Sequence, residues 1–405
     1  MKIFYGWIIV GVGIVTTCVG FGAMMSLSVF LQPMAQEMGW SRTGIATAAM
    51  LNFLAMGAGA FAWGALSDRF GTRVVVLCGG LLIGLGFVLA SRTTTLLQFQ
   101  LVFGLVVGIA ASSLYGPITA TTTRWFTTNR TLAVALVSAG LSFGSTLMAP
   151  LAGWLISTYD WRTAMLVIGD LVWLIVIPAA LLIRNAPAAP APSAPSVNAV
   201  APGPVMTVAA ALRTPQFAAI ALTHFACCAA HSGPIFHMVT HAIDRGIPAM
   251  AAATVLSVAG LASLSGKVVC GLAADRIGVK KTLLTGLLIQ ASAIILYLLT
   301  QSLGSFYALA VMFGLAYGGV MPLYAVLVRE YFGERIVGSV FGAVSTAATL
   351  GMALGPFVGG RLFDTVGSYA WMYVGASMIG FAAVVIALTF RAPRAVRRLT
   401  PQPAA

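Results

Sequence analysis

The sequence predicts an all-α membrane protein with twelve membrane-spanning helices, arranged as two pseudo-symmetric halves of six helices each. The first observation is composition: 60% of the residues are hydrophobic and only 8% are charged, whereas a surface in contact with water needs far more charge. The second is a series of apolar runs of about 20 residues, each long enough to cross a hydrocarbon core of ~30 Å. The third is an internal repeat. Because lipid satisfies no backbone hydrogen bonds, we expect the spans to be helices.

Twelve predicted spans cover most of the chain. They lie near residues 6–31, 44–65, 74–92, 98–122, 131–156, 164–183, 217–242, 250–270, 282–301, 306–327, 337–360 and 370–390. The chain begins Met1-Lys2-Ile3, with one positive residue and no small-residue cleavage site before Gly22. We therefore expect the first span to remain in the protein rather than to be removed as a signal peptide.

The positive charge is distributed unevenly between the two sides of the predicted membrane. Of the 22 Lys and Arg residues, sixteen lie in the termini and loops on one side, five lie on the other, and Lys267 lies inside a span. The positive-inside rule then places both termini in the cytoplasm, and we expect the membrane to be a bacterial inner membrane. The net charge of +13 thus indicates topology, and we expect no nucleic-acid partner.

The five cysteines lie in or at the ends of spans and lack the spacing of metal ligands. We expect reduced, packed thiols, with no disulfide framework, no metal site and no cofactor. We expect the protein to work as a monomer that contacts the lipid bilayer.

The chain divides into two halves at a stretch rich in proline and alanine. We predict an N-terminal half at residues 1–184, a cytoplasmic linker at 185–215, a C-terminal half at 216–391 and a short cytoplasmic tail at 392–405. The prolines make the linker extended and semi-rigid. Within it, residues 205–213 are expected to form a short helix on the membrane surface.

The two halves repeat each other. Gly64-Ala-Leu-Ser-Asp68-Arg69-Phe-Gly71-Thr-Arg73 aligns with Gly271-Leu-Ala-Ala-Asp275-Arg276-Ile-Gly278-Val-Lys280, a shift of 207 residues. Phe103-Gly104-Leu105 aligns with Phe313-Gly314-Leu315, and Pro150 with Pro356, at shifts of 210 and 206. Because each half has an even number of spans, the two copies have the same orientation. Such repeats enclose a substrate path at their interface, near the bilayer midplane.

The repeated loop resembles the signature of the major facilitator superfamily, and the resemblance covers the whole chain. It implies the major facilitator fold. It also implies that the charged residues of the loops help to close the cytoplasmic side in the outward-facing state, although a simple structural role for the loops is compatible with the same residues. These predicted gating residues are Asp68, Arg69, Arg73, Asp275, Arg276 and Lys280.

Further segments resemble the monocarboxylate transporter family and its bacterial relatives, including oxalate–formate exchangers. They are Phe4-Tyr5-Gly6-Trp7, Trp125-Phe126-x-x-x-Arg130-x-Leu132-Ala133, Ala139-Gly140-x-x-x-Gly144, Pro150-Leu151, Tyr331-Phe332-Gly333-x-Arg335 and Gly355-Pro356. Apart from the resemblance, small residues four positions apart, such as Gly140 and Gly144, predict close packing of helices.

Lys267 is the main candidate for binding a substrate. In the family that the chain resembles, an arginine at this position in the eighth span binds the substrate carboxylate; lysine is a departure, because its ammonium is a point charge rather than a bidentate fork. The acid that animal members carry one turn earlier is Ser263 here. Residues 336–360 of the eleventh span contain no Lys or Arg, which favours a monoanion. Snorkelling of Lys267 to the membrane surface, or a structural pair with another residue of the protein, is the alternative.

Other polar residues are weaker candidates, because aromatic and histidine side chains in membrane helices more often serve packing. Tyr115, Tyr317 and Tyr324 lie beside glycine and proline in equivalent spans, and their hydroxyls would donate to a carboxylate. The remaining candidates for substrate binding are Ser263, Asn52 and Ser28. The candidates for proton coupling are His231, His237 and Lys267 itself; His231 precedes Gly233-Pro234, where a helix can unwind.

These features predict a secondary active transporter that moves a small monocarboxylate of the lactate or pyruvate type, with a proton, by alternating access. The alternatives are an organic-anion exchanger of the oxalate–formate type, a drug exporter, which would not depend on Lys267, and a non-transporting membrane sensor. We do not expect an enzyme, because no nucleophile–base constellation is present. No nucleotide-binding G-x-x-x-x-G-K-[ST] motif is present either.

Overall fold

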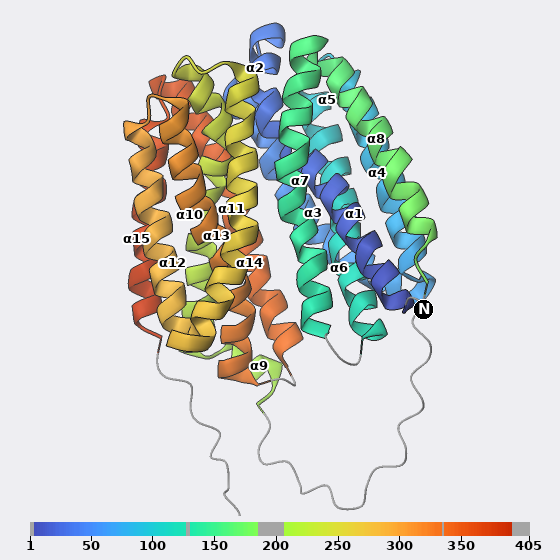
Figure 1. Ribbon diagram of the computed structural model, residues 1–405, viewed down its shortest axis with the longest axis vertical. Helices are drawn as coiled ribbons and strands as arrows, with labels where there is room; N and C mark the ends of the chain where they lie inside the picture. The colour runs from blue at the N-terminus through green and yellow to red at the C-terminus, as the bar shows by residue number, and fades with distance from the viewer. Residues whose placement is uncertain (1–3, 127–129, 185–205, 334–335, 391–405) are drawn as a thin grey trace, which may run out of the picture.

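The computed structural model describes residues 4–126, 130–184, 206–333 and 336–390. These residues contain twelve helices that are long and apolar enough to cross a membrane, which confirms the twelve predicted spans (Figure 1). Several helices are longer than predicted: the first continues from Tyr5 to Met38, where the sequence predicted 6–31. The hydrophobic pattern marks only the lipid-embedded part of a helix, and less apolar residues continue the helix beyond it.

The N-terminal half contains six spans, of which the first and fourth are built from more than one helical segment. Its elements are α1 (Tyr5–Met25), α2 (Leu27–Met38), α3 (Arg42–Phe70), α4 (Thr72–Ser91), α5 (Leu96–Phe99), the π-helix η1 (Gln100–Val107), α6 (Gly108–Trp125), α7 (Arg130–Thr158) and α8 (Trp161–Leu181).

The C-terminal half contains the other six spans. Its elements are α9 (Val208–Leu212), α10 (Pro215–Asp244), α11 (Ala249–Ile277), α12 (Val279–Leu296), the 3₁₀-helix η2 (Tyr297–Leu299), α13 (Leu303–Phe332), α14 (Val337–Val366) and α15 (Ala370–Leu388). Helix α9 corresponds to the predicted short helix at 205–213. Residues 185–205, which make up most of the predicted linker, and the predicted tail at 392–405 lie outside the described residues.

The repeated loop has the same backbone conformation in both halves. Gly71, between α3 and α4, has φ 85°, and Gly278, between α11 and α12, has φ 91°. These values lie in the region that a β-carbon disfavours, so glycine permits the tight turn at each position. The internal repeat of the sequence therefore corresponds to a repeated structural unit.

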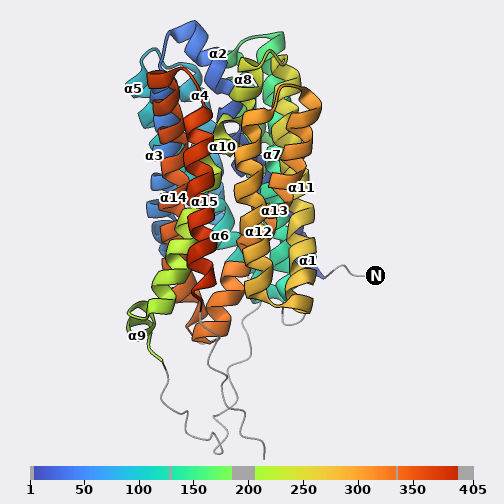
Figure 2. The same cartoon turned by 90° about the vertical axis from the view of Figure 1, so that its left-hand side faces the viewer.

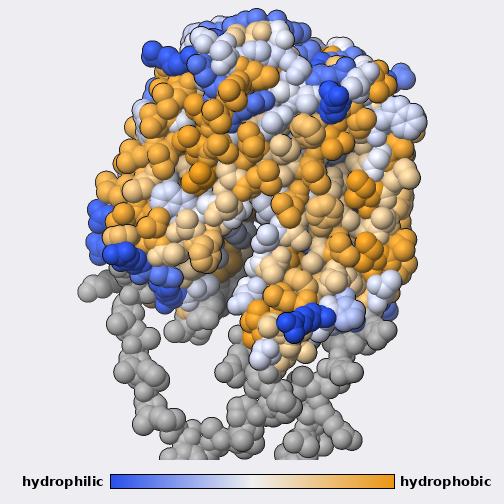
Figure 3. Space-filling view, turned by 180° about the vertical axis from the view of Figure 1, so that it is seen from behind, coloured by the Kyte–Doolittle hydropathy of each residue, from blue (hydrophilic) through white to orange (hydrophobic). Residues whose placement is uncertain are grey.

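The two ends of the bundle carry different residues. We call the end with Tyr5, α9 and Leu388 the terminal face, and the end with Arg42 and Asp244 the distal face (Figures 1 and 2). The halves meet mainly through two helix pairs, α3 with α14 and α7 with α11, and α2 also contacts α10. Figure 3 shows a broad hydrophobic band across the face in view and a hollow between the halves that opens toward the terminal face.

Small residues allow α1 and α7 to pack backbone against backbone, as the Ala139-Gly140-x-x-x-Gly144 pattern predicts. A β-carbon at Gly144 would lie 2.5 Å from the Cys18 carbonyl oxygen and 2.9 Å from the Gly22 Cα. A β-carbon at Gly140 would lie 2.6 Å from the Ile14 carbonyl oxygen. This close approach fixes α7, and with it the side chains that α7 presents to α11.

Helix α10 does not unwind at Gly233-Pro234, so this expectation from the sequence is wrong. It runs without a break from Pro215 to Asp244. Gly233 packs directly on α14, where a β-carbon would lie 3.1 Å from the Gly355 carbonyl oxygen. This tight glycine–glycine contact leaves no room for a loop at the proline.

We predict that Gly144→Leu destabilises the protein by about 1–3 kcal/mol, the usual effect of overpacking a close contact. Thermal unfolding of the detergent-purified protein measures it. Gly116→Leu is the matched control, because a β-carbon at that helical glycine has nothing within 4 Å. Equal unfolding temperatures for the two variants would contradict the packing described.

Candidate functional site

A cavity of about 350 Å³ lies between the two halves. Its walls come from α1, α2, α3, η1 and α7 of one half and from α10, α11, α13 and α14 of the other. Cavities of roughly 300–1,000 Å³ hold drug-sized ligands. Most of the lining side chains are apolar, among them Phe21, Met24, Phe53, Phe236, Leu256 and Met352.

Lys267 brings a charge into this apolar cavity. Among the described residues that line it, no other is a Lys, Arg, Asp or Glu. Nζ of Lys267 donates to the Ser138 carbonyl at 3.2 Å and to the Ser142 hydroxyl at 3.0 Å, both on α7. The lysine therefore bridges the two halves. Within the described part of the chain, none of the ion pairs within 4 Å includes it.

The position of Lys267 in α11 agrees with a cavity residue better than with a snorkelling one. Ser263 is the middle residue of the 29 in α11, and Lys267 lies one turn from it toward the terminal face. A snorkelling side chain would extend along its own helix to the membrane surface. Here the ammonium reaches across to α7 instead, where Ser138 and Ser142 lie on the terminal side of the middle of that helix.

Polar groups continue from Lys267 along the cavity wall. The Ser142 hydroxyl lies 3.5 Å from that of Ser263, and Tyr317 faces Ser263 through its hydroxyl. The ring of His231 lies beside that of Tyr317, with 5.3 Å between the centroids. Nδ1 of His231 is buried and has no hydrogen-bond partner among the described residues. Four predicted site residues, Lys267, Ser263, Tyr317 and His231, thus lie together.

Asn52 and Ser28 also line the cavity, from α3 and α2. Nδ2 of Asn52 donates to the Phe103 carbonyl at 2.9 Å, within the π-helical segment η1. Its Oδ1 is buried without a partner among the described residues. The Ser28 hydroxyl donates to the Met25 carbonyl at 3.2 Å. Asn52 therefore has an unpaired acceptor buried in the cavity wall, whereas Ser28 is engaged locally.

Tyr115, Tyr324 and His237 do not line the cavity, although the sequence singled them out. The Tyr115 hydroxyl lies 2.9 Å from the Ser138 hydroxyl, so this tyrosine neighbours a residue that Lys267 contacts. Tyr324 is buried and stacks on His224, with 3.9 Å between ring centroids. His237 belongs to a separate polar network near the distal face.

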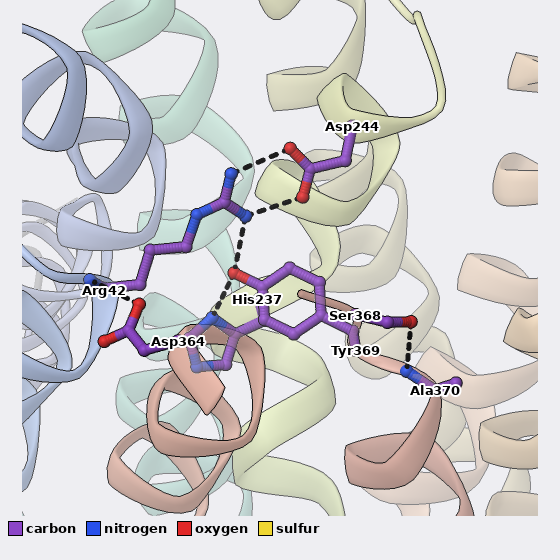
Figure 4. A network of polar contacts seen from close by, with 7 residues as sticks. All are labelled: Arg42, His237, Asp244, Asp364, Ser368, Tyr369 and Ala370. Carbon is purple, nitrogen blue, oxygen red and sulfur yellow. Dashed lines mark hydrogen bonds and ion pairs between the residues drawn. The ribbon is translucent and has the colours of Figure 1, made fainter. Parts of the chain in front are cut away.

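That network, which we call the distal network, joins α3 to the C-terminal half (Figure 4). Its members are Arg42, His237, Asp244, Asp364 and Tyr369. The Arg42 guanidinium donates to both carboxylate oxygens of Asp244, at 2.6 and 2.8 Å. Asp364 accepts from the backbone N–H groups of Arg42 and Thr43, at 3.1 and 2.7 Å. A carboxylate at a helix N-terminus is electrostatically favourable.

The distal network determines the hydrogen-bonding roles of His237. The Pro356 carbonyl can only accept, so Nε2 of the neutral imidazole carries the hydrogen and Nδ1 accepts from the Tyr369 hydroxyl at 3.1 Å. The same hydroxyl accepts from Arg42 at 3.0 Å. Nε2 of His237 donates to the Pro356 carbonyl at 2.9 Å, and Pro356 lines the cavity. Burial raises the pKa of Tyr369 above its usual value, which keeps the hydroxyl protonated. The network connects the distal face to the cavity wall.

Among the described residues, the polar contacts of the two predicted gating loops lie within their own halves. Asp68 accepts from Nη2 of Arg124 at 2.9 Å, and both side chains are exposed. Lys280 donates to the carbonyls of Leu388 and Phe390, at 2.9 and 2.6 Å, at the end of α15. The guanidinium of Arg69 lies over the ring of Phe70. In the described part of the chain, none of the ion pairs within 4 Å involves the other three predicted residues, Arg73, Asp275 and Arg276.

Sequence reasoning missed Ser138, Ser142, Arg42 and Asp364. Ser138 precedes the small-residue pattern of α7 and Ser142 lies within it; this pattern indicated packing but carried no sign of a lysine partner. Arg42 entered only as one charge on the distal side. Its partners Asp244 and Asp364 lie more than 200 residues away in the sequence, so no local pattern indicates these contacts.

The fold and the position of the cavity are those of a membrane transporter of the major facilitator type. The sequence model of the Major Facilitator Superfamily matches residues 12–271 and 232–405, and the chain belongs to this superfamily. Within it, the chain belongs to the monocarboxylate transporter-like family. It is 30% identical over 387 residues to monocarboxylate transporter 11 of Mus musculus, covering 92% of this chain and 84% of the relative.

Three further proteins are similar to the chain, one in sequence and two in fold. Monocarboxylate transporter 13 of Bos taurus is 28% identical over 388 residues, covering 95% of this chain and 89% of the relative. A bacterial homologue of the human lysosomal transporter Spinster, solved in an inward-facing and occupied conformation, shares the fold with a TM-score of 0.76. It is 15% identical and covers 96% of this chain and 97% of its own. A mutant of the nucleoside transporter NupG gives a TM-score of 0.76 at 12% identity, covering 95% and 99%.

We predict that Arg42→Gln opens the distal face. Hydrogen bonds to charged groups contribute about 1.5–3 kcal/mol, so losing them shifts the balance toward a distally open state by roughly tenfold or more. The readout is labelling of Ile235→Cys, a cavity position, from the distal side by an impermeant maleimide, with the five native cysteines replaced. The matched control is Arg162→Gln, because Arg162 binds the Ser91 and Thr93 carbonyls of its own half. Unchanged labelling in Arg42→Gln would contradict a closing role.

Proposed function

We propose that the protein is a secondary active transporter that moves a monocarboxylate of the lactate and pyruvate class together with a proton, by alternating access. The observation that carries the proposal is the Lys267 ammonium, in a cavity between the halves, without a carboxylate partner among the described residues. A charge within the membrane costs about 2.5–3.5 kcal/mol on insertion scales. An anionic substrate supplies the missing counter-charge.

The charge distribution supports an orientation with the terminal face in the cytoplasm of a bacterial cell. Most Lys and Arg residues belong to the termini and the loops on that side, as the positive-inside rule requires. The cavity is then open to the cytoplasm and closed toward the outside by the distal network. Transport requires the opposite arrangement as well, in which the terminal ends of α7 and α11 close and the distal ends of α3 and α14 separate.

Substrate binding replaces contacts that Lys267 makes in the structure. A carboxylate beside Nζ competes with the Ser138 carbonyl and the Ser142 hydroxyl, which are weaker partners because they are uncharged. The freed Ser142 hydroxyl, with those of Ser263 and Tyr317, is placed to donate to the second carboxylate oxygen. Binding would therefore exchange a direct link between α7 and α11 for one that runs through the substrate.

The lack of an acid beside Lys267 gives a simple route to proton coupling. When the site is loaded, the ammonium and the carboxylate neutralise each other. When the site is empty, a lysine can give up its proton, so that no unpaired charge accompanies the return step; an arginine cannot. His231, joined to this corner through Tyr317, is the second candidate for the proton site.

Two alternatives predict different behaviour. An exchanger of dianions needs a second cation in the cavity, and Lys267 is alone among its described lining residues. A drug exporter would accept neutral apolar compounds and would not depend on Lys267. One experiment with purified protein distinguishes both alternatives from monocarboxylate symport.

We predict that Lys267→Gln lowers the uptake of labelled lactate into proteoliposomes by roughly 10- to 100-fold, since it removes a charge-assisted bond worth about 1.5–3 kcal/mol. Lys281→Gln is the control, an exposed lysine at the terminal end of α12. Normal lactate uptake by Lys267→Gln would exclude the lysine as the anchor.

We predict that Lys267→Arg separates exchange from net transport. The guanidinium still binds a carboxylate but keeps its proton, so exchange of labelled for unlabelled lactate continues while uptake driven by an inward proton gradient is lost. His231→Gln distinguishes the two candidate sites: it abolishes gradient-driven uptake only if the proton resides on the histidine. Gradient-driven uptake that survives in both variants would rule out either residue as the proton site.

A further inference from the structure

We infer that, among the monocarboxylates it accepts, the protein binds most tightly those with an apolar body considerably larger than that of lactate, such as an alkyl or aryl chain of about six to ten carbons at ~1.3 Å per bond. The inference rests on the proposed function, because it takes Lys267 as the carboxylate anchor. It adds the chemical class of the remainder of the substrate, which the cavity on the distal side of Lys267 determines.

The cavity is much deeper than a three-carbon acid. On α11 its lining runs from Lys267 to Leu256, eleven residues apart, which is about 16 Å of helix at 1.5 Å per residue. On α10 the lining runs from His224 to Phe236, about 18 Å by the same measure. A chain of three carbons extends for only about 4 Å, so lactate held at Lys267 would leave most of the cavity empty.

The walls change character along this depth. Around Lys267 they carry the hydroxyls of Ser142, Ser263 and Tyr317. Toward the distal face most of the lining is apolar, with Met24, Leu27, Phe236, Leu256, Ala259 and Met352. The hydroxyls of Ser28, Ser145 and Ser232 also lie there, and each donates to a backbone carbonyl. Methionine side chains adapt their shape to apolar ligands, and burying each methylene in such surroundings is favourable. A carboxylate at one end and a hydrocarbon body at the other match this arrangement.

The same lining excludes two other substrate classes. A dicarboxylate of equal length would place its second charge among apolar side chains, because no described lining residue other than Lys267 carries a cation. A neutral hydrocarbon would leave the Lys267 ammonium without a counter-charge. The substrate is therefore a monoanion with its charge at one end.

The test measures binding of a series of straight-chain acids, from propanoate to decanoate, to the purified protein in nanodiscs by isothermal titration calorimetry. Binding avoids the passive permeation of fatty acids, which obscures uptake. We expect the affinity to rise roughly two- to fourfold per added methylene up to about eight carbons, as burial in an apolar site predicts. Octanedioate and octanol should each bind at least tenfold more weakly than octanoate.

A substitution that fills part of the cavity tests where the hydrocarbon chain of the acid binds. Ala259→Leu fills the cavity two turns from Lys267 on the distal side and should weaken octanoate at least tenfold while leaving propanoate within twofold. Ala348→Leu, on the facing helix α14, is a second variant should the first fail to fold. Leu261→Phe is the matched control, on the outer surface of α11 with 50% of the side chain exposed.

The possible results separate this inference from the proposed function. If propanoate and octanoate bind equally well and both require Lys267, the inference on chain length is wrong and the monocarboxylate function stands. If octanol binds as tightly as octanoate, or if Lys267→Gln binds every acid like the wild type, the proposed function itself is wrong. If the affinity rises with the length of the acid but Ala259→Leu does not alter this rise, the hydrocarbon chain binds elsewhere and the inference is wrong.

Discussion

The bridge from Lys267 to α7 is the interaction on which the organisation of the site depends. It puts a charge close to the middle of the membrane, ties the two halves together through the Ser138 carbonyl and the Ser142 hydroxyl, and leaves that charge without a carboxylate within the described residues. Uncharged partners stabilise a buried ammonium only partly. The surrounding features follow from this constraint: close packing that fixes α7, hydroxyls gathered at one corner, and an otherwise apolar cavity.

The distal network complements this site at the other end of the cavity. Arg42 and Asp244 neutralise each other in an ion pair, so the protein alone closes the distal contact. Lys267 has no carboxylate partner among the described residues, so a ligand would complete the contact at the centre. His237 connects the two regions through the Pro356 carbonyl, because Pro356 borders the cavity. Displacement of α14 by a substrate would therefore reach Tyr369 and Arg42 through one unbroken series of hydrogen bonds.

The sequence predicted the twelve spans, the internal repeat and Lys267, because each is a strong local signal: an apolar run, a repeated glycine loop, or a charge in an apolar segment. It did not predict the partners of these residues. Arg42 and Asp244 lie 202 residues apart, and their pairing depends on how the two halves dock. Tyr115 and Tyr324 lie beside proline and glycine as expected, but the rotation of each helix points their side chains to Ser138 and His224. Helix rotation is set by packing against neighbours, which residue spacing alone does not determine.

The most direct measurement is a structure of the protein determined by electron cryo-microscopy with octanoate at saturating concentration. The carboxylate of octanoate, bound in the cavity between the two halves, should lie about 3 Å from Nζ of Lys267. The bond from Lys267 to the Ser138 carbonyl should be lost, and the hydrocarbon chain of the acid should extend between Leu256 and Met352. Density for the acid elsewhere, with Lys267 still bonded to Ser138 and Ser142, would contradict the role assigned to this lysine.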